Sequence, residues 1–130
     1  MSDVSRRLQP SDWGAVFGSF AAGRLVGMLG VQREAMRKLG HKAFIWGMYV
    51  APEHRLGGHG ARLLRQALSH AWHVLGVAQV NLGVHVDNTA AIGLYRRFGF
   101  EVWGTERGSL KVDGAMQDEH HMVCHAPGTA

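Results

Sequence analysis

The chain has 130 residues, and its 14 Lys and Arg against 10 Asp and Glu give a formal net charge of +4. The length is typical of one domain with its own core, and 46% hydrophobic with 18% charged residues excludes a disordered or fibrous chain. The sequence has no apolar run of about 18 residues, which excludes a membrane-spanning helix. Its single cysteine, Cys124, excludes an internal disulfide and indicates a reducing compartment, so we expect a cytoplasmic protein.

The positive charge favours an anionic ligand or partner. Nucleic acid is not the expected partner, because the Lys and Arg residues are scattered rather than clustered with aromatic residues. Glycine is the unusual residue: 18 glycines are about twice the ordinary share of ~7%. They occur without a collagen-like period, so tight turns or close approach of the backbone to a ligand must explain them.

The first half of the chain predicts three strands. Residues 14–20 and 25–31 read as an antiparallel pair joined by a short connection that contains Gly23. Residues 43–50 (AFIWGMYV) are continuously apolar, which is typical of a strand buried on both faces. That strand ends before Pro52, since proline cannot donate to a ladder.

The second half alternates helices and strands. Helical periodicity over residues 61–75 ends at Gly76, and a second helix begins after the capping segment Asp87-Asn88-Thr89 and ends at Gly99. The expected strands are residues 79–86, 100–110 and 115–124, the last two joined through Asp113-Gly114. The predicted order β-β-β-α-β-α-β-β describes an α/β (α+β) fold, with a mixed sheet flanked by helices in one domain, residues 1–130.

The loop between the third strand and the first helix is rich in glycine. Gly57, Gly58 and Gly60 leave room for a phosphate at the N-terminus of the helix, and Arg55 and Arg62 add positive charge. A P-loop is excluded because the required lysine is missing, and a Rossmann fingerprint is excluded because Leu63 replaces its third glycine. An ordinary strand-to-helix turn remains the alternative.

Two segments resemble the GNAT superfamily of N-acetyltransferases. Arg55-Leu56-Gly57-Gly58-His59-Gly60 is similar to the family motif Arg/Gln-x-x-Gly-x-Gly/Ala and follows a buried strand. Residues 86–100 (VDNTAAIGLYRRFGF) are similar to the family segment Asn-x-x-Ala-x-x-Leu-Tyr-x-x-x-Gly-Phe. The two motifs occur in the expected order, and the resemblance covers nearly the whole chain. It implies a GNAT-like, mostly antiparallel sheet with acetyl-CoA as co-substrate.

The resemblance also implies which residues bind acetyl-CoA. Backbone amides of the glycine loop would bind its pyrophosphate, and amides at a bulge late in the preceding strand would pair with its pantetheine arm. An asparagine before the second helix would bind the cofactor, and a tyrosine on that helix would lie beside the thioester sulfur. The corresponding positions in this sequence are Arg55, Gly57, Gly58, His59, Gly60 and Ala61 for the loop, Met48 and Val50 for the bulge, and Asn88 and Tyr95.

The chemistry of acyl transfer suits these residue types. The N–H of Val50 would stabilise the oxyanion and Tyr95 would protonate the leaving thiolate, although Tyr95 can also be read as an aromatic packed on the buried side of its helix. A base is harder to find because residues 43–50 hold no carboxylate. His85 is the first candidate, with a purely structural histidine as the alternative, and Glu34 and Glu119 are weaker ones. Cys124 is not expected to carry the acyl group.

No metal is expected in residues 118–125 (DEHHMVCH), since strand alternation does not place three good ligands on one face. Compared with the family, the chain lacks the usual strand-helix unit before residue 14. Residues 15–20 would then form an exposed edge, which predicts a homodimer. The expected function is acetyl transfer to the primary amine of a small molecule or peptide, with no membrane partner. The alternative is a CoA-binding module of the same fold without catalysis.

Overall fold

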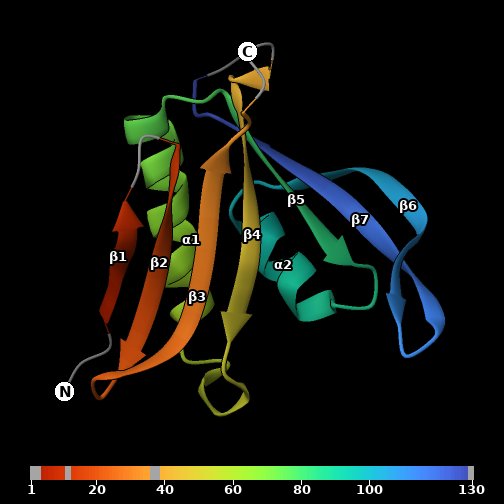
Figure 1. The fold of residues 1–130 in the computed structure, drawn as a ribbon, viewed down its shortest axis with the longest axis horizontal. Helices are drawn as coiled ribbons and strands as arrows, with labels where there is room; N and C mark the ends of the chain where they lie inside the picture. The colour runs from red at the N-terminus through yellow and green to blue at the C-terminus, as the bar shows by residue number, and fades with distance from the viewer. Residues whose placement is uncertain (1–3, 11–12, 36–38, 129–130) are drawn as a thin grey trace.

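The computed structural model describes residues 4–10, 13–35 and 39–128, with side chains from residue 13 onward. One seven-stranded sheet in the order β1-β2-β3-β4-β5-β7-β6 organises the chain (Figure 1). The strands are β1 (Val4–Pro10), β2 (Gly14–Ala21), β3 (Arg24–Arg33), β4 (Lys42–Val50), β5 (Gln79–His85), β6 (Glu101–Val112) and β7 (Ala115–His125). The helices are α1 (His59–His70) and α2 (Thr89–Arg97), with a 3-10 turn at Pro52–His54 and a π-helical turn at Ala71–Leu75.

The sheet opens between its two parallel strands. β4 and β5 pair over Lys42–Phe44 and Gln79–Asn81, after which they separate toward their C-terminal ends (Figure 1). The other neighbouring strands pair antiparallel along most of their length. The predicted mixed, mostly antiparallel sheet is confirmed, and the opening between β4 and β5 is the feature that positions the site.

The predicted order lacks the first strand. β1 pairs antiparallel with β2, from Val4 opposite Phe20 to Pro10 opposite Ala15. Residues 4–10 (VSRRLQP) were missed because they show no alternation of apolar and polar residues. The prediction that no strand precedes residue 14 is therefore wrong, and so is the prediction of a free edge at residues 15–20. That free edge was the reason to expect a homodimer, so the homodimer loses this support and stays a prediction.

Glycines end both helices as the sequence predicts. The π-helical turn continues α1 to Leu75, and Gly76 follows in the left-handed region at φ +66°. Gly99 follows α2 at φ +95°. The β6–β7 hairpin turns at Asp113 and Gly114, with φ of +49° and +80°, as its Asp-Gly pair predicts. None of the helices in the described part of the chain is long and apolar enough to cross a membrane.

The core lies between the sheet and α1 with α2. Its largest fully buried side chains include Leu29, Leu63, Phe100 and Met122. α1 covers β2, where the Phe17 and His70 rings meet edge to face at 5.7 Å. Cys124 is a free, buried thiol in this core, and the cytoplasmic location that a lone cysteine suggests stays a prediction.

Candidate functional site

The separation of β4 and β5 forms a cavity of about 260 Å³. Late residues of both strands and the turn before α2 line it, together with the buried face of α2: Ile45, Trp46, Gly47, Met48, Leu82, Gly83, Val84, His85, Asn88 and Tyr95. Four of the predicted site residues meet here, namely Met48, His85, Asn88 and Tyr95. The cavity thus joins the predicted bulge to the second sequence motif.

β4 carries the bulge that the sequence predicts. Its pairing with β3 shifts between Trp46 and Tyr49, and Gly47 adopts φ +65°. Beyond the bulge the Ala51 N–H donates to the Val26 carbonyl of β3 at 2.7 Å. Because successive N–H groups of a strand point in opposite directions, those of Met48 and Val50 point away from β3, toward the opening. Both donors therefore point toward the gap between β4 and β5, and Met48 lines the cavity there.

The glycine loop leads into α1 with its backbone exposed. Gly58 is the N-cap residue of α1 at φ +81°, and it makes no side-chain capping bond. A Cβ on Gly58 would lie 3.1 Å from Nη1 of Arg62, and one on Gly60 would lie 3.2 Å from Cε of Met48. The first N–H groups of a helix have no partner within the helix and carry partial positive charge. The loop therefore fits a phosphate group through its backbone.

Arginine side chains surround this loop. Arg55 Nε donates to the Val50 carbonyl at 3.1 Å, which ties the loop to the end of β4. Arg62 Nη2 donates to the Gly57 carbonyl at 3.3 Å. The His59 side chain is turned inward: it is 3% exposed, and its Nδ1 lies 2.5 Å from Ser19 Oγ. Only the backbone N–H of His59 is suited to meet an anion.

Tyr95 and Asn88 reach the cavity from α2. Tyr95 is 5% exposed, its ring lies 5.7 Å from that of Phe100, and burial raises the pKa of its hydroxyl above the ordinary value. A buried phenol that stays protonated suits a proton donor. Asn88 Oδ1 accepts the Ala91 N–H at 3.1 Å, so this residue caps α2 while it lines the cavity.

His85 lies in the cavity with both ring nitrogens engaged. Nδ1 accepts the Asp87 N–H at 3.0 Å, which assigns the ring proton to Nε2, and Nε2 then donates to Gln117 Oε1 at 2.7 Å. The imidazole therefore fixes the turn between β5 and α2. It can accept a proton only after the bond to Asp87 opens, which makes it a poorer base than the sequence suggests.

Comparison with known proteins identifies the family. Residues 3–100 match the model of the Acetyltransferase (GNAT) family. The chain belongs to this family. It is 38% identical over 98 residues to the N-alpha-acetyltransferase RimI of Mycobacterium tuberculosis, covering 75% of this chain and 59% of that protein. It is 29% identical over 82 residues to the spermidine N(1)-acetyltransferase of Vibrio cholerae, covering 63% of this chain and 47% of that protein.

The solved structures agree on the fold. A GNAT-family acetyltransferase of Streptococcus pneumoniae superposes with a TM-score of 0.83 at 21% identity, over 89% of this chain and 69% of that one. The GNAT fold inferred from the two motifs is thus confirmed. The chain spans 47% to 62% of the length of the curated relatives that it matches.

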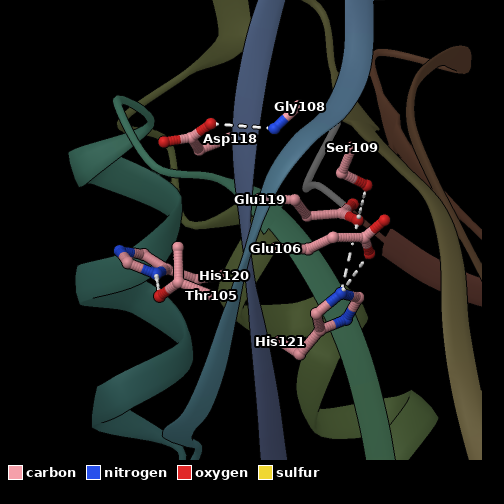
Figure 2. Close-up of polar contacts among 8 residues, drawn as sticks. All are labelled: Thr105, Glu106, Gly108, Ser109, Asp118, Glu119, His120 and His121. Atoms are coloured by element: carbon pink, nitrogen blue, oxygen red, sulfur yellow. Dashed lines mark hydrogen bonds and ion pairs between the residues drawn. The ribbon is translucent and has the colours of Figure 1, made fainter.

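Next to the cleft of this GNAT fold, the β6–β7 hairpin gathers polar side chains that sequence analysis did not connect. Figure 2 shows Thr105 with His120 on the side of α2, and Glu106, Ser109, Glu119 and His121 together on the opposite side. His121 Nε2 lies 2.9 Å from Glu106 Oε1 and 3.7 Å from Glu119 Oε1. The signal that could have connected these residues is that Glu106 lies opposite Glu119 in the β6–β7 hairpin. Because the register of β6 shifts between Glu106 and Leu110, this pairing cannot be found by counting residues back from the turn.

Ligand atoms of Glu106, Glu119 and His121 lie within 4.8 Å of one another, close enough to share a metal ion. The 2.9 Å separation of His121 and Glu106 is the length of a hydrogen bond, which already uses one imidazole nitrogen and one carboxylate oxygen. The expectation that no metal takes part stays a prediction.

Proposed function

We propose that the protein transfers the acetyl group of acetyl-CoA to a primary amine, by direct attack in a ternary complex. The observation that carries this proposal is the cleft between β4 and β5, which is lined by Met48 of the β4 bulge and by the buried Tyr95 of α2. These are donors for an oxyanion and for a leaving thiolate, on opposite walls of one cavity.

Acetyl-CoA would bind along the path from the glycine loop to the cleft. Its pyrophosphate would meet the N–H groups from Gly58 to Ala61, where the left-handed Gly58 brings the backbone forward. Arg55 and Arg62 add positive charge beside it, and the amides of Met48 and Val50 pair with the pantetheine arm. The thioester then lies in the cavity, near Asn88 and Tyr95.

The reaction needs no covalent enzyme intermediate. The amine nitrogen attacks the thioester carbon, and the carbonyl oxygen takes up negative charge beside the Val50 N–H. The C–S bond then breaks, and the thiolate takes the proton of the Tyr95 hydroxyl. The amine nitrogen loses one proton as the C–N bond forms. This proton balances the one that the thiolate takes, because Tyr95 regains a proton before the next turnover.

The test measures thiol release from acetyl-CoA with a panel of amines. Relatives of this chain are named as a spermidine N(1)-acetyltransferase, an L-amino acid N-acetyltransferase of Escherichia coli and an N-alpha-acetyltransferase, so the panel contains spermidine, L-leucine, L-leucinamide and a short peptide that begins with alanine. We expect release with at least one amine. Tyr95→Phe should lower kcat about 100-fold, since general acid catalysis contributes at least that much, while acetyl-CoA affinity stays within about twofold.

Two results would contradict the proposal. Unchanged turnover of Tyr95→Phe would remove this hydroxyl from the mechanism. Acetyl-CoA binding in calorimetry without thiol release for every amine would instead favour a CoA-binding module that lacks catalysis.

A further inference from the structure

The carboxylate of Glu119 fills the space beside Gly83 of β5, where a side chain at that position would lie. Glu119 pairs with His85 across β5 and β7, and its side chain extends along β5 over Gly83. A Cβ on Gly83 would lie 2.7 Å from the Glu119 carboxyl carbon, so a larger residue at this position would force the carboxylate to move. Gly83 lines the cleft, so the carboxylate lies against a residue of the cleft wall.

A second cavity of about 230 Å³ adjoins the cleft at this point. The two cavities share Ile45, Leu82 and Gly83, and the second is lined further by Phe44, Asn81, Trp103 and His121. Trp103 is 64% exposed and stacks on the His121 ring at 5.5 Å. This cavity opens on the face of the sheet away from α2, the side on which Figure 2 shows Glu119 and His121. It offers an amine a route to the thioester that does not cross the glycine loop.

The surroundings of Glu119 hold its carboxylate in place. Ser109 Oγ donates to Oε1 of Glu119 at 2.9 Å, and His121 Nε2 lies 3.7 Å from the same oxygen. Both contacts use Oε1, whereas the other carboxylate oxygen, Oε2, lies toward Gly83. The Glu119 side chain is 19% exposed, so a carboxylate in a fixed position still meets solvent.

The other candidate bases are less well placed. Glu34 follows β3, and its N–H donates to the Lys42 carbonyl at the first residue of β4, away from the bulge at the other end of that strand. His85 lies in the cleft, but Asp87 and Gln117 engage its ring nitrogens. Glu119 alone of these three has a carboxylate oxygen directed at a residue shared by both cavities.

We propose that Glu119 receives the proton that the attacking amine loses, and that the acceptor reaches it through the second cavity. The inference rests on the proposed acetyl transfer. As the C–N bond forms, one N–H bond of the amine breaks and its proton passes to Oε2 of Glu119, and from there to water. Glu106 and Glu119 place two carboxylates beside His121, which lines the second cavity, so the acceptor class that this cavity fits is an amine without a neighbouring carboxylate.

The first test compares Glu119→Gln with Glu101→Gln. The glutamine keeps the size of the side chain but cannot accept the proton, so kcat should fall about 100-fold and the acidic limb of the pH–rate profile should disappear, while acetyl-CoA affinity is unchanged. Glu101 is exposed on β6, and its variant should match the wild type. The urea midpoint of each variant checks that the fold is intact.

The second test compares L-leucinamide with L-leucine, which differ by the charge beside the amino group. We expect kcat/KM to favour L-leucinamide at least about tenfold in the wild type, and Glu106→Gln to reduce that ratio severalfold. The change of this ratio from the wild type to Glu106→Gln does not depend on the difference in basicity between the two amines, since both enzymes are tested with the same pair of substrates. Glu101→Gln serves again as the control.

The inference is overturned if Glu119→Gln keeps kcat within about twofold, or if His85→Gln loses the acidic limb and Glu119→Gln keeps it. Equal use of L-leucine and L-leucinamide, or a ratio that Glu106→Gln leaves unchanged, overturns the acceptor class. A fully active Glu119→Gln beside an impaired Tyr95→Phe refutes this inference alone. Absence of thiol release with every amine refutes the acetyl transfer and the inference with it.

Discussion

The glycine loop follows β4 and the β6–β7 hairpin pairs with β5, but these two neighbours of the cleft strands offer different groups to a ligand. The loop offers backbone N–H groups, kept accessible by Gly58 and Gly60, and its one buried side chain, His59, points into the core. The hairpin offers side chains, namely the carboxylates of Glu106 and Glu119 with the rings of His121 and Trp103. Backbone donors suit a ligand shared by a whole family, whereas side chains can vary with the acceptor.

The first prediction compares the packing on the helix side of the sheet with the packing around Trp103 on the hairpin. Phe100 is 1% exposed and packs against Tyr95, so Phe100→Ala should lower the free energy of unfolding by about 3–5 kcal/mol. Trp103 on the hairpin is 64% exposed, and Trp103→Ala should change the free energy of unfolding by only about 0.5 kcal/mol. Urea unfolding followed by circular dichroism measures both. A Trp103→Ala loss as large as that of Phe100→Ala would show that the hairpin side is as tightly packed as the helix side.

The second prediction separates backbone strain from ligand binding on the loop side. Gly58 and Gly76 both have positive φ, +81° and +66°, so alanine at either position should cost about 1–2 kcal/mol of stability. Only Gly58 lies at the N-terminus of α1, where its Cβ would crowd Arg62. We therefore expect acetyl-CoA affinity, measured by calorimetry, to fall about tenfold in Gly58→Ala and to stay unchanged in Gly76→Ala. Equal affinities in the two variants would mean that the loop backbone does not bind the cofactor.

The same contrast explains what the sequence could predict. Gly57, Gly58 and Gly60 lie together in the sequence, and a local motif suffices because a phosphate bound there would meet local backbone. The bulge of β4, the caps at Gly76 and Gly99 and the turn at Asp113-Gly114 are equally local. Each depends on the few residues that form it.

The remaining features depend on contacts between distant segments. Glu119 reaches Gly83 across a strand pair, and Glu106 meets His121 only after the register of β6 shifts between Glu106 and Leu110. The engagement of both His85 nitrogens depends on Gln117, which lies 32 residues away. β1 was missed for a related reason: it is held by its pairing with β2, and its own residues show no strand pattern.

The third prediction concerns the proton on the Tyr95 hydroxyl, on the helix side of the cleft. Burial raises its pKa above the ordinary value of 10.0, because the phenolate would be poorly solvated there. The folded state thus holds this proton more tightly than the unfolded state, and the stability that results is present below pH 10 and is lost as the pH rises through the folded pKa. The difference in tyrosinate absorbance between the wild type and Tyr95→Phe should appear only above pH 10 while the protein stays folded. Ionisation of Tyr95 at lower pH would show that the hydroxyl is solvated and would weaken its role as a proton donor.

The smallest expected effect is that of Cys124→Ala, which tests whether the hairpin supplies a nucleophile as well as carboxylates. Cys124 belongs to β7, like Glu119, but its side chain faces the helices: it is 6% exposed, and Sγ donates to the Phe98 carbonyl at 3.4 Å. Burial raises the pKa of the thiol, so it stays protonated and unreactive near neutral pH. Removing one buried sulfur should cost about 1 kcal/mol of stability and leave kcat within about twofold.

Direct transfer also predicts that the mass of the protein does not change when it is incubated with acetyl-CoA and no amine. An acetylated Cys124, with a matching loss of turnover in Cys124→Ala, would replace the ternary complex with a covalent intermediate. It would also require the helix side of β7 to open during each turnover, since the thiol has no access to the cleft while Cys124 is packed beside Phe98 and Gly99. Cys124 and Glu119 belong to the same strand, but the sulfur is buried and the carboxylate is accessible. We therefore expect Cys124→Ala to leave turnover unchanged and Glu119→Gln to lower it strongly.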